Sequence, residues 1–255
     1  MKIFVLVKQV PDTETSIKVS GNSISESGIK WIISPFDEHA IEGALKIKEQ
    51  AGGNSTITAV SLGPDRVVEA LRTAYAFGAD YVVHLKDDAT SPLDISLAAA
   101  VLGNYLKAES PDLILTGHIA IDSQSSMVPA MIAEYLGCPN INNAVEITVE
   151  GDSVQVKREV EGGTAKMESK TPVVITAAKN LNSPRYPNLK GIMAAKKKPI
   201  DTKPAEDYAS GAVKVEVVSL ELPPPRPAGR IIDGASPAEK AAELVKALRD
   251  EAKVI

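Results

Sequence analysis

Residues 1–8 read Met-Lys-Ile-Phe-Val-Leu-Val-Lys, and the continuous apolar run from Ile3 to Val7 decides the fold class. An apolar strand without polar alternation is typical of a parallel sheet covered on both faces. Similar runs follow at residues 56–60, 81–85, 113–115 and 173–176. Patterns typical of helices lie between them, around residues 40–45, 67–75, 97–105 and 126–136. This alternation predicts an α/β fold with a doubly wound, mostly parallel sheet.

Two later segments depart from that pattern. From Val145 to Ser169 apolar residues alternate with polar ones around the turn at Gly151-Asp152, which predicts an antiparallel hairpin at a sheet edge. After Lys198 prolines become frequent, and the chain ends in a helical pattern with one apolar stripe. We expect a core domain over residues 1–198 and an extended C-terminal arm over 199–255. The arm is expected to pack on a partner subunit, with a flexible tail as the alternative.

Three expected helix starts share the pattern Ser-Pro-x-acid, at residues 34–37, 91–94 and 236–239. Serine is a favoured helix cap, proline suits the first helical position, and the acidic side chain can bond back to the serine N–H. Plain capping explains the second and third cases, whereas Ser34 is also a candidate ligand contact.

Composition excludes several classes of protein. The 255 residues are 44% hydrophobic, and 28 Lys+Arg against 33 Asp+Glu leave a net charge of -5, so neither nucleic acid nor membrane is an expected partner. The single cysteine, Cys138, fits a reducing compartment and is interpreted as a small buried side chain. The first apolar run stops at Lys8, too early for a signal peptide, so we expect a cytoplasmic protein of bacterial type.

No catalytic or metal-binding set emerges from the sequence. His39, His84 and His118 are scattered without metal-ligand spacing. The glycine patterns of hydrolase nucleophiles, of phosphate-binding P-loops and of dinucleotide-binding folds are all absent. An NAD-dependent enzyme is therefore disfavoured.

The loop from Thr116 to Ser126 is the best candidate for a nucleotide site. It follows an apolar strand and precedes a helix, so it should lie at the carboxyl edge of the sheet, where open α/β folds bind ligands. Its serine hydroxyls and the free N–H groups of the helix start suit a phosphate, although serines at helix starts often act only as caps. Asp122 would repel a phosphate and is assigned to capping or to a ribose hydroxyl. The loops at residues 34–36 and 61–64 should reach the same edge.

The segment from Asn180 to Lys198 predicts an exposed basic protrusion. Pro184 and Pro187 stiffen a loop that carries the apolar residue Leu189 and leads into the run Lys196-Lys197-Lys198. An apolar anchor beside basic residues suits docking to an acidic protein surface. The alternative is a solvated lysine run that favours the dipole at a helix C-terminus.

Several of these segments together resemble the β subunit of electron transfer flavoproteins. The similarity runs in family order over about residues 1–200. The matching stretches are 5–12, 34–38, 60–64, 120–122, 157–163, 172–176 and 182–198.

The resemblance implies a Rossmann-like, adenine-nucleotide-binding fold and a heterodimer with a larger α subunit. FAD would be held mainly by the α subunit and partly enclosed by this chain, which would bind a structural AMP and perform no bond chemistry. Residues carried over to the AMP pocket are Leu6, Ser34, Pro35, Phe36, Asp37, Leu62, Asp122, Ser123, Gln124, Ser125, Ser126, Met127, Val128, Pro129 and Ala133.

The resemblance also implies a route for electrons. They would come from flavoprotein dehydrogenases, such as the acyl-CoA dehydrogenases of fatty acid oxidation, and pass to a membrane quinone oxidoreductase. The dehydrogenase-docking residues carried over are Pro184, Arg185, Tyr186, Leu189, Ile192, Lys196, Lys197 and Lys198, with Leu189 as the anchor.

Two departures from the family bear on the cofactors. Some members place an aromatic residue near the flavin where this chain offers only Thr13. Electron-bifurcating members, which bind a second FAD and NADH, tend to carry Asp-Gly-Asp-Thr-Ala-Gln-Val-Gly where this chain has the glycine-free stretch 122–129. AMP is therefore the expected occupant, with the bifurcating type as the first alternative. A free-standing adenine-nucleotide-binding regulator is the alternative of another class.

Overall fold

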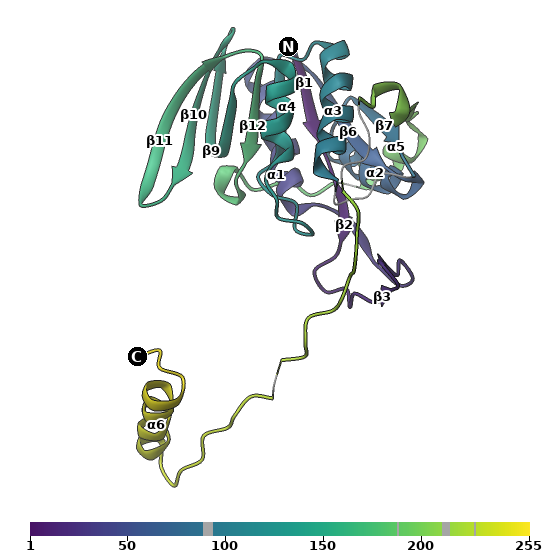
Figure 1. Ribbon diagram of the computed structural model, residues 1–255. Coiled ribbons are helices and arrows are strands. Elements are labelled where there is room, and N and C mark those ends of the chain that lie inside the picture. The colour runs from purple at the N-terminus through teal and green to yellow at the C-terminus, as the bar shows by residue number, and fades with distance from the viewer. Residues whose placement is uncertain (89–93, 188, 211–214, 227) are drawn as a thin grey trace. The chain divides into compact units, whose positions relative to one another are not determined.

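The computed structural model describes residues 1–88, 94–187, 189–210, 215–226 and 228–255 (Figure 1). The chain divides into two compact units, Met1–Val218 and Ser219–Ile255. The first unit is built on one large sheet with helices on both faces, and the second is a short helical segment preceded by extended chain.

The large sheet of the first unit has nine strands in the order β11-β10-β9-β12-β8-β1-β6-β7-β13. In this order, every neighbouring pair from β9 through β12, β8, β1, β6 and β7 to β13 is parallel. Strands β10 and β11 add an antiparallel edge next to β9. Their bounds are β1 Lys2–Leu6, β6 Thr56–Gly63, β7 Tyr81–Lys86, β8 Leu113–Gly117, β9 Asn140–Glu150, β10 Ser153–Val160, β11 Gly163–Lys170, β12 Val173–Ala177 and β13 Asp201–Pro204. Two small antiparallel sheets pair β2 (Gln9–Pro11) with β5 (Trp31–Ile33) and β3 (Val19–Ser20) with β4 (Ser23–Ile24).

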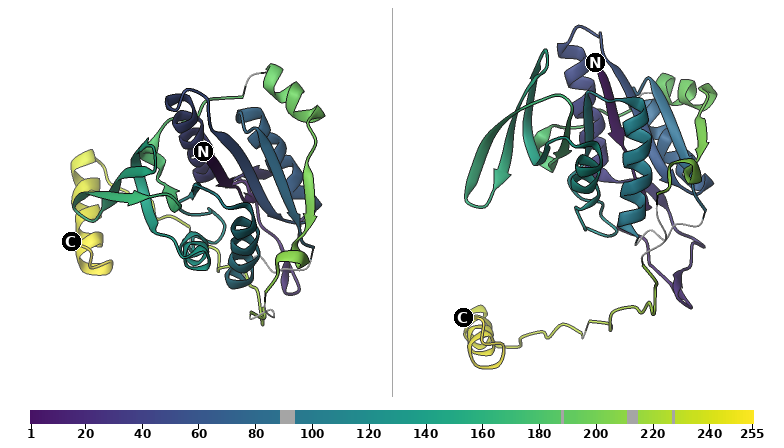
Figure 2. Two further views of the ribbon diagram at one scale, coloured as in Figure 1. Left: turned by 90° about the horizontal axis from the view of Figure 1, so that it is seen from above. Right: turned by 45° about the horizontal axis from the view of Figure 1, so that its top comes forward.

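The helices form two outer layers, so the expected doubly wound α/β fold is confirmed. Their bounds are α1 Pro35–Gln50, α2 Val68–Phe77, α3 Ile95–Glu109, α4 Val128–Leu136, α5 Leu189–Lys197 and, in the second unit, α6 Pro237–Lys246. In the view from above, α3 and α4 lie on the opposite side of the sheet from α1 and α2 (Figure 2). Short helical turns occur at η1 Asp65–Val67, η2 Lys179–Leu181, η3 Ala205–Tyr208 and η4 Ala247–Glu251.

The apolar run of β1 is continuous because the strand is covered on both sides. Ile3 and Val5 are fully buried in the cluster that includes α1 and α2. Phe4 and Leu6, which point the other way, are buried in the cluster that includes α3 and α4. Because successive side chains of a strand point to opposite faces, alternate residues of this short run are buried in two separate clusters.

The predicted hairpin is confirmed, and its first strand has a second role. β9, β10 and β11 are joined as antiparallel neighbours, with β11 at the edge of the sheet. The early part of β9 also pairs in parallel with β12, so this strand links the antiparallel edge to the parallel core.

The predicted capping pattern holds for one helix and fails for another. Ser236 caps α6 by accepting the N–H of Glu239 at 3.3 Å. At α1, Ser34 is fully buried and makes no side-chain cap bond. The Asp37 side chain accepts the N–H groups of Lys8 and Gly117 and not that of Ser34. Ser91 lies outside the described residues, and α3 is capped by Asp94, whose Oδ1 accepts the N–H of Leu97 at 3.1 Å.

The first unit extends further along the chain than the boundary expected at residue 198. β13 pairs in parallel with β7, and Tyr208 in η3 meets Tyr105 of α3 edge-on with ring centroids 5.3 Å apart. The second unit holds α6, and an ion pair of 2.7 Å joins Arg230 to Glu251. On α6, Leu244 and Val245 are 46% and 44% exposed, so neither apolar side chain is buried within the described chain.

Gly117, at the end of β8, lies too close to the start of α1 for any side chain. A Cβ there would come within 2.5 Å of Asp37 Oδ1 and 2.9 Å of the Phe36 carbonyl carbon. We predict that Gly117→Ala lowers the free energy of unfolding by about 1–3 kcal/mol, because backbone must shift to make room. Urea unfolding of the full chain measures this. Gly163→Ala is the control, since a Cβ at Gly163 has nothing within 4 Å. Equal unfolding midpoints for the two variants would contradict the steric account.

Candidate functional site

The predicted nucleotide loops do meet at one place, the carboxyl edge between β1 and β8. From β1 the chain adds β6 and β7 on one side and then returns to place β8 on the other side of β1. Such a reversal opens a crevice beyond the strand ends, which is where open α/β sheets bind ligands. Residues 8, 34–37 and 117–126 surround this reversal point.

Asp37 bridges the two strand ends across that point. Its Oδ2 accepts the backbone N–H of Lys8 at 2.7 Å, and its Oδ1 accepts the backbone N–H of Gly117 at 2.9 Å. The side chain is buried, and burial raises the pKa of Asp37 to about 7, although the two N–H bonds act in the opposite direction. Both oxygens are therefore used within the protein, and the structure gives Asp37 a bridging position at the predicted site.

An ion pair between Lys8 and Asp122 forms a second bridge between the segments that follow β1 and β8. Their Nζ and Oδ2 atoms are 2.7 Å apart, and Asp122 Oδ1 accepts the N–H of Ser123 at 2.8 Å. Ser126 Oγ donates to the carbonyl of His118 at 2.6 Å, which closes the loop. Gln124 and Ser126 have φ angles of 50° and 55°, in the left-handed region. The loop is thus shaped by bonds of its own side chains and by two left-handed backbone positions that are not glycine.

Helix α4 begins at Val128, two residues after the expected start at Ser126, because Ser126 adopts a left-handed backbone. Met127 precedes the helix and provides no side-chain cap, and proline occupies the first turn at Pro129. N–H groups at this helix start are therefore not covered by a capping side chain, which suits an anion. Ser125 is partly buried beside them.

An apolar surface lies behind this loop on the α3 and α4 side of the sheet. Leu6 and Ala133 are buried in one cluster, and Leu62 and Val128 pack against it. Ser34 is fully buried, and its Oγ has no hydrogen-bond partner among the described residues. Apolar side chains, loop hydroxyls and an uncapped helix start are thus gathered at this edge, and these are the kinds of group that a mononucleotide site uses. Ser34 and Asp37 belong instead to the buried support of the site.

The predicted docking segment is partly helical. Leu189 is the first residue of α5, and its side chain is 80% exposed. Tyr186 and Met193 are also exposed, at 96% and 66%. Ile192 is also exposed, at 40%. The sequence predicts a loop that carries Leu189, whereas the structure places this residue at the start of a helix that continues to Lys197.

Two of the predicted docking residues instead hold the segment to the core. Arg185 donates from Nε to Glu42 Oε2 at 2.7 Å and from Nη1 to Glu49 Oε1 at 2.8 Å, both on α1. Lys198 lies over the ring of Tyr75, 4.5 Å from its centroid. Lys196 and Lys197 are exposed in the last turn of α5, where they also favour the helix dipole.

The C-terminal end of α5 is fixed by α2. Arg72 Nη1 donates to the carbonyls of Ala195, at 2.6 Å, and of Lys198. Tyr75 donates its hydroxyl to the carbonyl of Pro199 at 2.8 Å. The exposed apolar residues of α5 are thus presented on a helix that is bonded to the core at its end.

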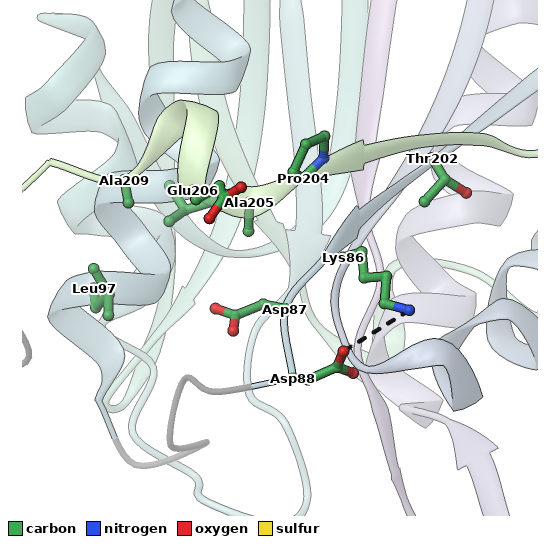
Figure 3. Close-up of a pocket in the computed structure, with 10 residues that line it drawn as sticks. Lys86, Asp87, Asp88, Leu97, Thr202, Pro204, Ala205, Glu206 and Ala209 are labelled. Atoms are coloured by element: carbon green, nitrogen blue, oxygen red, sulfur yellow. Dashed lines mark ion pairs between the residues drawn. The ribbon is translucent and has the colours of Figure 1, made fainter.

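Two pockets lie outside the residues carried over to the AMP and docking sites, although His118 of the 116–126 loop lines one of them. One, of about 550 Å³, is lined by Lys86, Asp88, Leu97, Pro204 and Glu206 among others, and Figure 3 shows the Lys86–Asp88 ion pair at its rim. The other, of about 700 Å³, is lined by residues of β9, β10 and β11 with His118. Residues 157–163, several of which line this second pocket, stand out in the sequence only through the family resemblance and not through a pattern typical of a site.

Comparison with known proteins identifies the family. A family model described as an electron transfer flavoprotein domain matches residues 21–208. The chain belongs to the electron transfer flavoprotein β-subunit family. It is 41% identical over 261 residues to the electron transfer flavoprotein subunit beta of Bacillus subtilis, with all of both chains covered. It is 39% identical over 254 residues to that of Syntrophomonas wolfei, covering 100% of this chain and 98% of the relative. The similarity to the subunit of Bradyrhizobium diazoefficiens is 37% over 260 residues, again with both chains fully covered.

Membership in this family supports an electron-transfer role, an association with flavin and an α-subunit partner. In the part of the chain that the structure describes, no helix has the length and apolar character required to cross a membrane. Within the same residues, no group of three or more His, Cys, Asp or Glu side chains is placed to hold a metal ion.

The buried bridge at Asp37 predicts a specific pH dependence. The ordinary pKa of 3.8 applies in the unfolded chain and a value of about 7 in the folded chain, so only the folded chain holds this proton between those pH values. The free energy of unfolding should therefore fall as the pH rises through that window. Asp37→Asn should remove this contribution, up to about 4 kcal/mol across the window.

Urea unfolding of the full chain at pH 4.5 to 7.5 measures the effect. The test compares the slope of the free energy of unfolding against pH and not its absolute value. Asparagine also changes the absolute value, because it offers one oxygen acceptor in place of two. Glu134→Gln, on an exposed residue of α4, is the control and should keep the wild-type slope. A wild-type slope in Asp37→Asn would show that the carboxyl group is not the source.

Proposed function

We propose that the chain is the smaller subunit of a heterodimeric electron transfer flavoprotein of the non-bifurcating type. It accepts electrons from flavoprotein dehydrogenases, such as acyl-CoA dehydrogenases, and passes them to a membrane quinone oxidoreductase. FAD, held mainly by the α subunit, supplies the redox chemistry when bound. The chain's own residues bind a structural AMP, help to enclose the flavin and recognise partners in the cytoplasm.

The nucleotide part of the proposal is supported by the site between β1 and β8. The adenine would lie against Leu6, Leu62 and Ala133, and the phosphate would face Ser125 and the uncapped start of α4. Asp37 and the Lys8–Asp122 ion pair hold the surrounding loops in place. Non-glycine side chains at residues 123–126 leave a diphosphate less access to the backbone, which favours AMP over a second FAD.

The partner part is supported by the C-terminal unit. The apolar stripe of α6 with Leu244 and Val245 has no buried residue in the described chain. An amphipathic helix is stabilised chiefly by packing that stripe against another surface. The α subunit is the proposed surface.

The observation that carries the docking part is the exposure of Leu189 on a fixed helix. A large apolar side chain that is 80% exposed contributes nothing to the core of this chain. Tyr186, Ile192 and Met193 extend the apolar surface around it, and Lys190, Lys196 and Lys197 are exposed nearby in sequence. An apolar centre with a basic rim fits an acidic partner with a small apolar pocket.

The nucleotide content is directly testable. Denaturing the purified heterodimer should release one AMP and one FAD, as measured by chromatography. Ser125→Asp should lower the AMP content before the FAD content, because it places negative charge at the helix start. Ser20→Asp, in the exposed β3–β4 hairpin, is the control. Two FAD per heterodimer would instead identify a bifurcating protein, and release of adenine nucleotide from a chain that binds no flavoprotein partner would favour a free-standing regulator.

Docking is testable at Leu189. Leu189→Ala should raise the Michaelis constant of the heterodimer as electron acceptor for a cognate dehydrogenase by about 30-fold, because an apolar anchor entering a pocket is a hot spot. The flavin spectrum and the unfolding temperature should stay unchanged, since the residue is exposed.

Ile24→Ala, an exposed apolar residue on the β3–β4 hairpin, is the matched control and should leave the Michaelis constant unchanged. A lowered unfolding temperature with unaltered electron transfer in Leu189→Ala would make the residue structural and the docking assignment wrong.

A further inference from the structure

Arg158, on β10, has no partner within the described chain. Its Nε atom is buried without an acceptor, and no described carboxylate forms an ion pair with it. The other partly buried arginines are bonded: Arg66 to Glu26 and Gln9, and Arg72 to two carbonyls. A buried donor left unpaired is costly, and more so on a charged group, so an acceptor from outside the chain is expected.

The strands beside Arg158 leave room for that acceptor. Arg158 lies opposite Ala165 on β11 and opposite Ala144 on β9, so both cross-strand neighbours are small. The β9–β10 pairing shifts register between Lys157 and Arg158, and the β9–β12 pairing shifts between Ile175 and Ala177. Such irregularities redirect side chains away from the regular ladder. The first of these shifts directly precedes Arg158, which lines a pocket of about 700 Å³.

Other polar residues line the same pocket as Arg158. Asn142, Asn143 and Thr164 line it and offer neutral donors. His118 also lines it, with Nδ1 3.3 Å from Thr176 Oγ1. Burial, and then the positive charge of Arg158, lower the pKa of His118, so the imidazole is neutral at neutral pH.

Two carboxylates lie at the same pocket and limit what it accepts. Glu159 accepts the side-chain N–H of Asn180 at 3.0 Å, and Glu161 is exposed in the β10–β11 turn. They would repel a polyphosphate, so the charge pattern suits a singly charged, planar carboxylate flanked by cations. A protein surface supplies that combination, whereas a free nucleotide does not.

We propose that Arg158 receives an Asp or Glu side chain of the α subunit in this pocket, which is lined by residues of β9, β10 and β11. The inference rests on the proposed function, because it takes the α subunit as the partner. The guanidinium fork would bind the carboxylate through two hydrogen bonds, and the glutamates would face basic residues around it. The antiparallel edge of the sheet thereby becomes part of the subunit interface.

The test is heterodimer affinity, measured by titrating the full chain with the α subunit. Arg158→Gln should weaken binding by about 30-fold or more, since it leaves a partner charge unpaired. Arg158→Lys should weaken it less, because the charge stays but the fork is lost. Lys166→Gln, which removes an exposed positive charge from β11 outside the pocket, should leave affinity unchanged.

A double-mutant cycle identifies the acceptor. One acidic residue of the α subunit, changed to its amide, should reproduce the loss and add nothing further when combined with Arg158→Gln. The full chain alone should unfold at the same or a higher temperature after Arg158→Gln, because the side chain has no bond to lose there.

The outcomes separate the two proposals. Unchanged affinity in Arg158→Gln, or a lowered unfolding temperature of the variant chain alone, overturns the Arg158 assignment and leaves the proposed function standing. If the wild-type chain binds no α subunit, both fail.

Discussion

The two hydrogen bonds from Lys8 and Gly117 to the buried carboxyl group of Asp37 are the constraint on which the rest of the first unit depends. They join the ends of β1 and β8 where the chain changes its direction of travel across the sheet. Helix α1 must therefore start within contact of β8, and only a glycine fits at residue 117. The loops that would hold a nucleotide are positioned by this closure.

The strands of the core could be predicted because burial on both faces leaves a continuous apolar run, as in Ile3–Val7. β13 could not, because Asp201–Pro204 carries no apolar pattern and is stabilised by pairing with β7 at the edge of the sheet. The helical start at Leu189 was equally hidden, since the nearby prolines and Gly191 suggest a loop. Tertiary bonds from Arg72 fix the end of that helix, and local sequence does not report them.

The candidate site could likewise be predicted only in part from the sequence. Sequence order placed residues 34–37 and 122–129 at one edge, which the topology confirms. It could not distinguish a side chain that faces a ligand from one that supports the site, because both follow strand ends. Ser34 and Asp37 are buried supports, and Arg185 is bonded to α1. Arg158 shows its character only through the absence of a partner among the described residues, which no local pattern encodes.

Under the proposed docking role, the bonded end of α5 has a kinetic consequence. A helix whose end is bonded to Arg72 and Tyr75 keeps its shape between encounters, so little ordering would be needed at each contact. Contact can then be brief and still specific, with a small apolar centre limiting how long each complex lasts. Turnover of a shuttle depends on departure as much as on arrival, and a pre-shaped but small surface serves both.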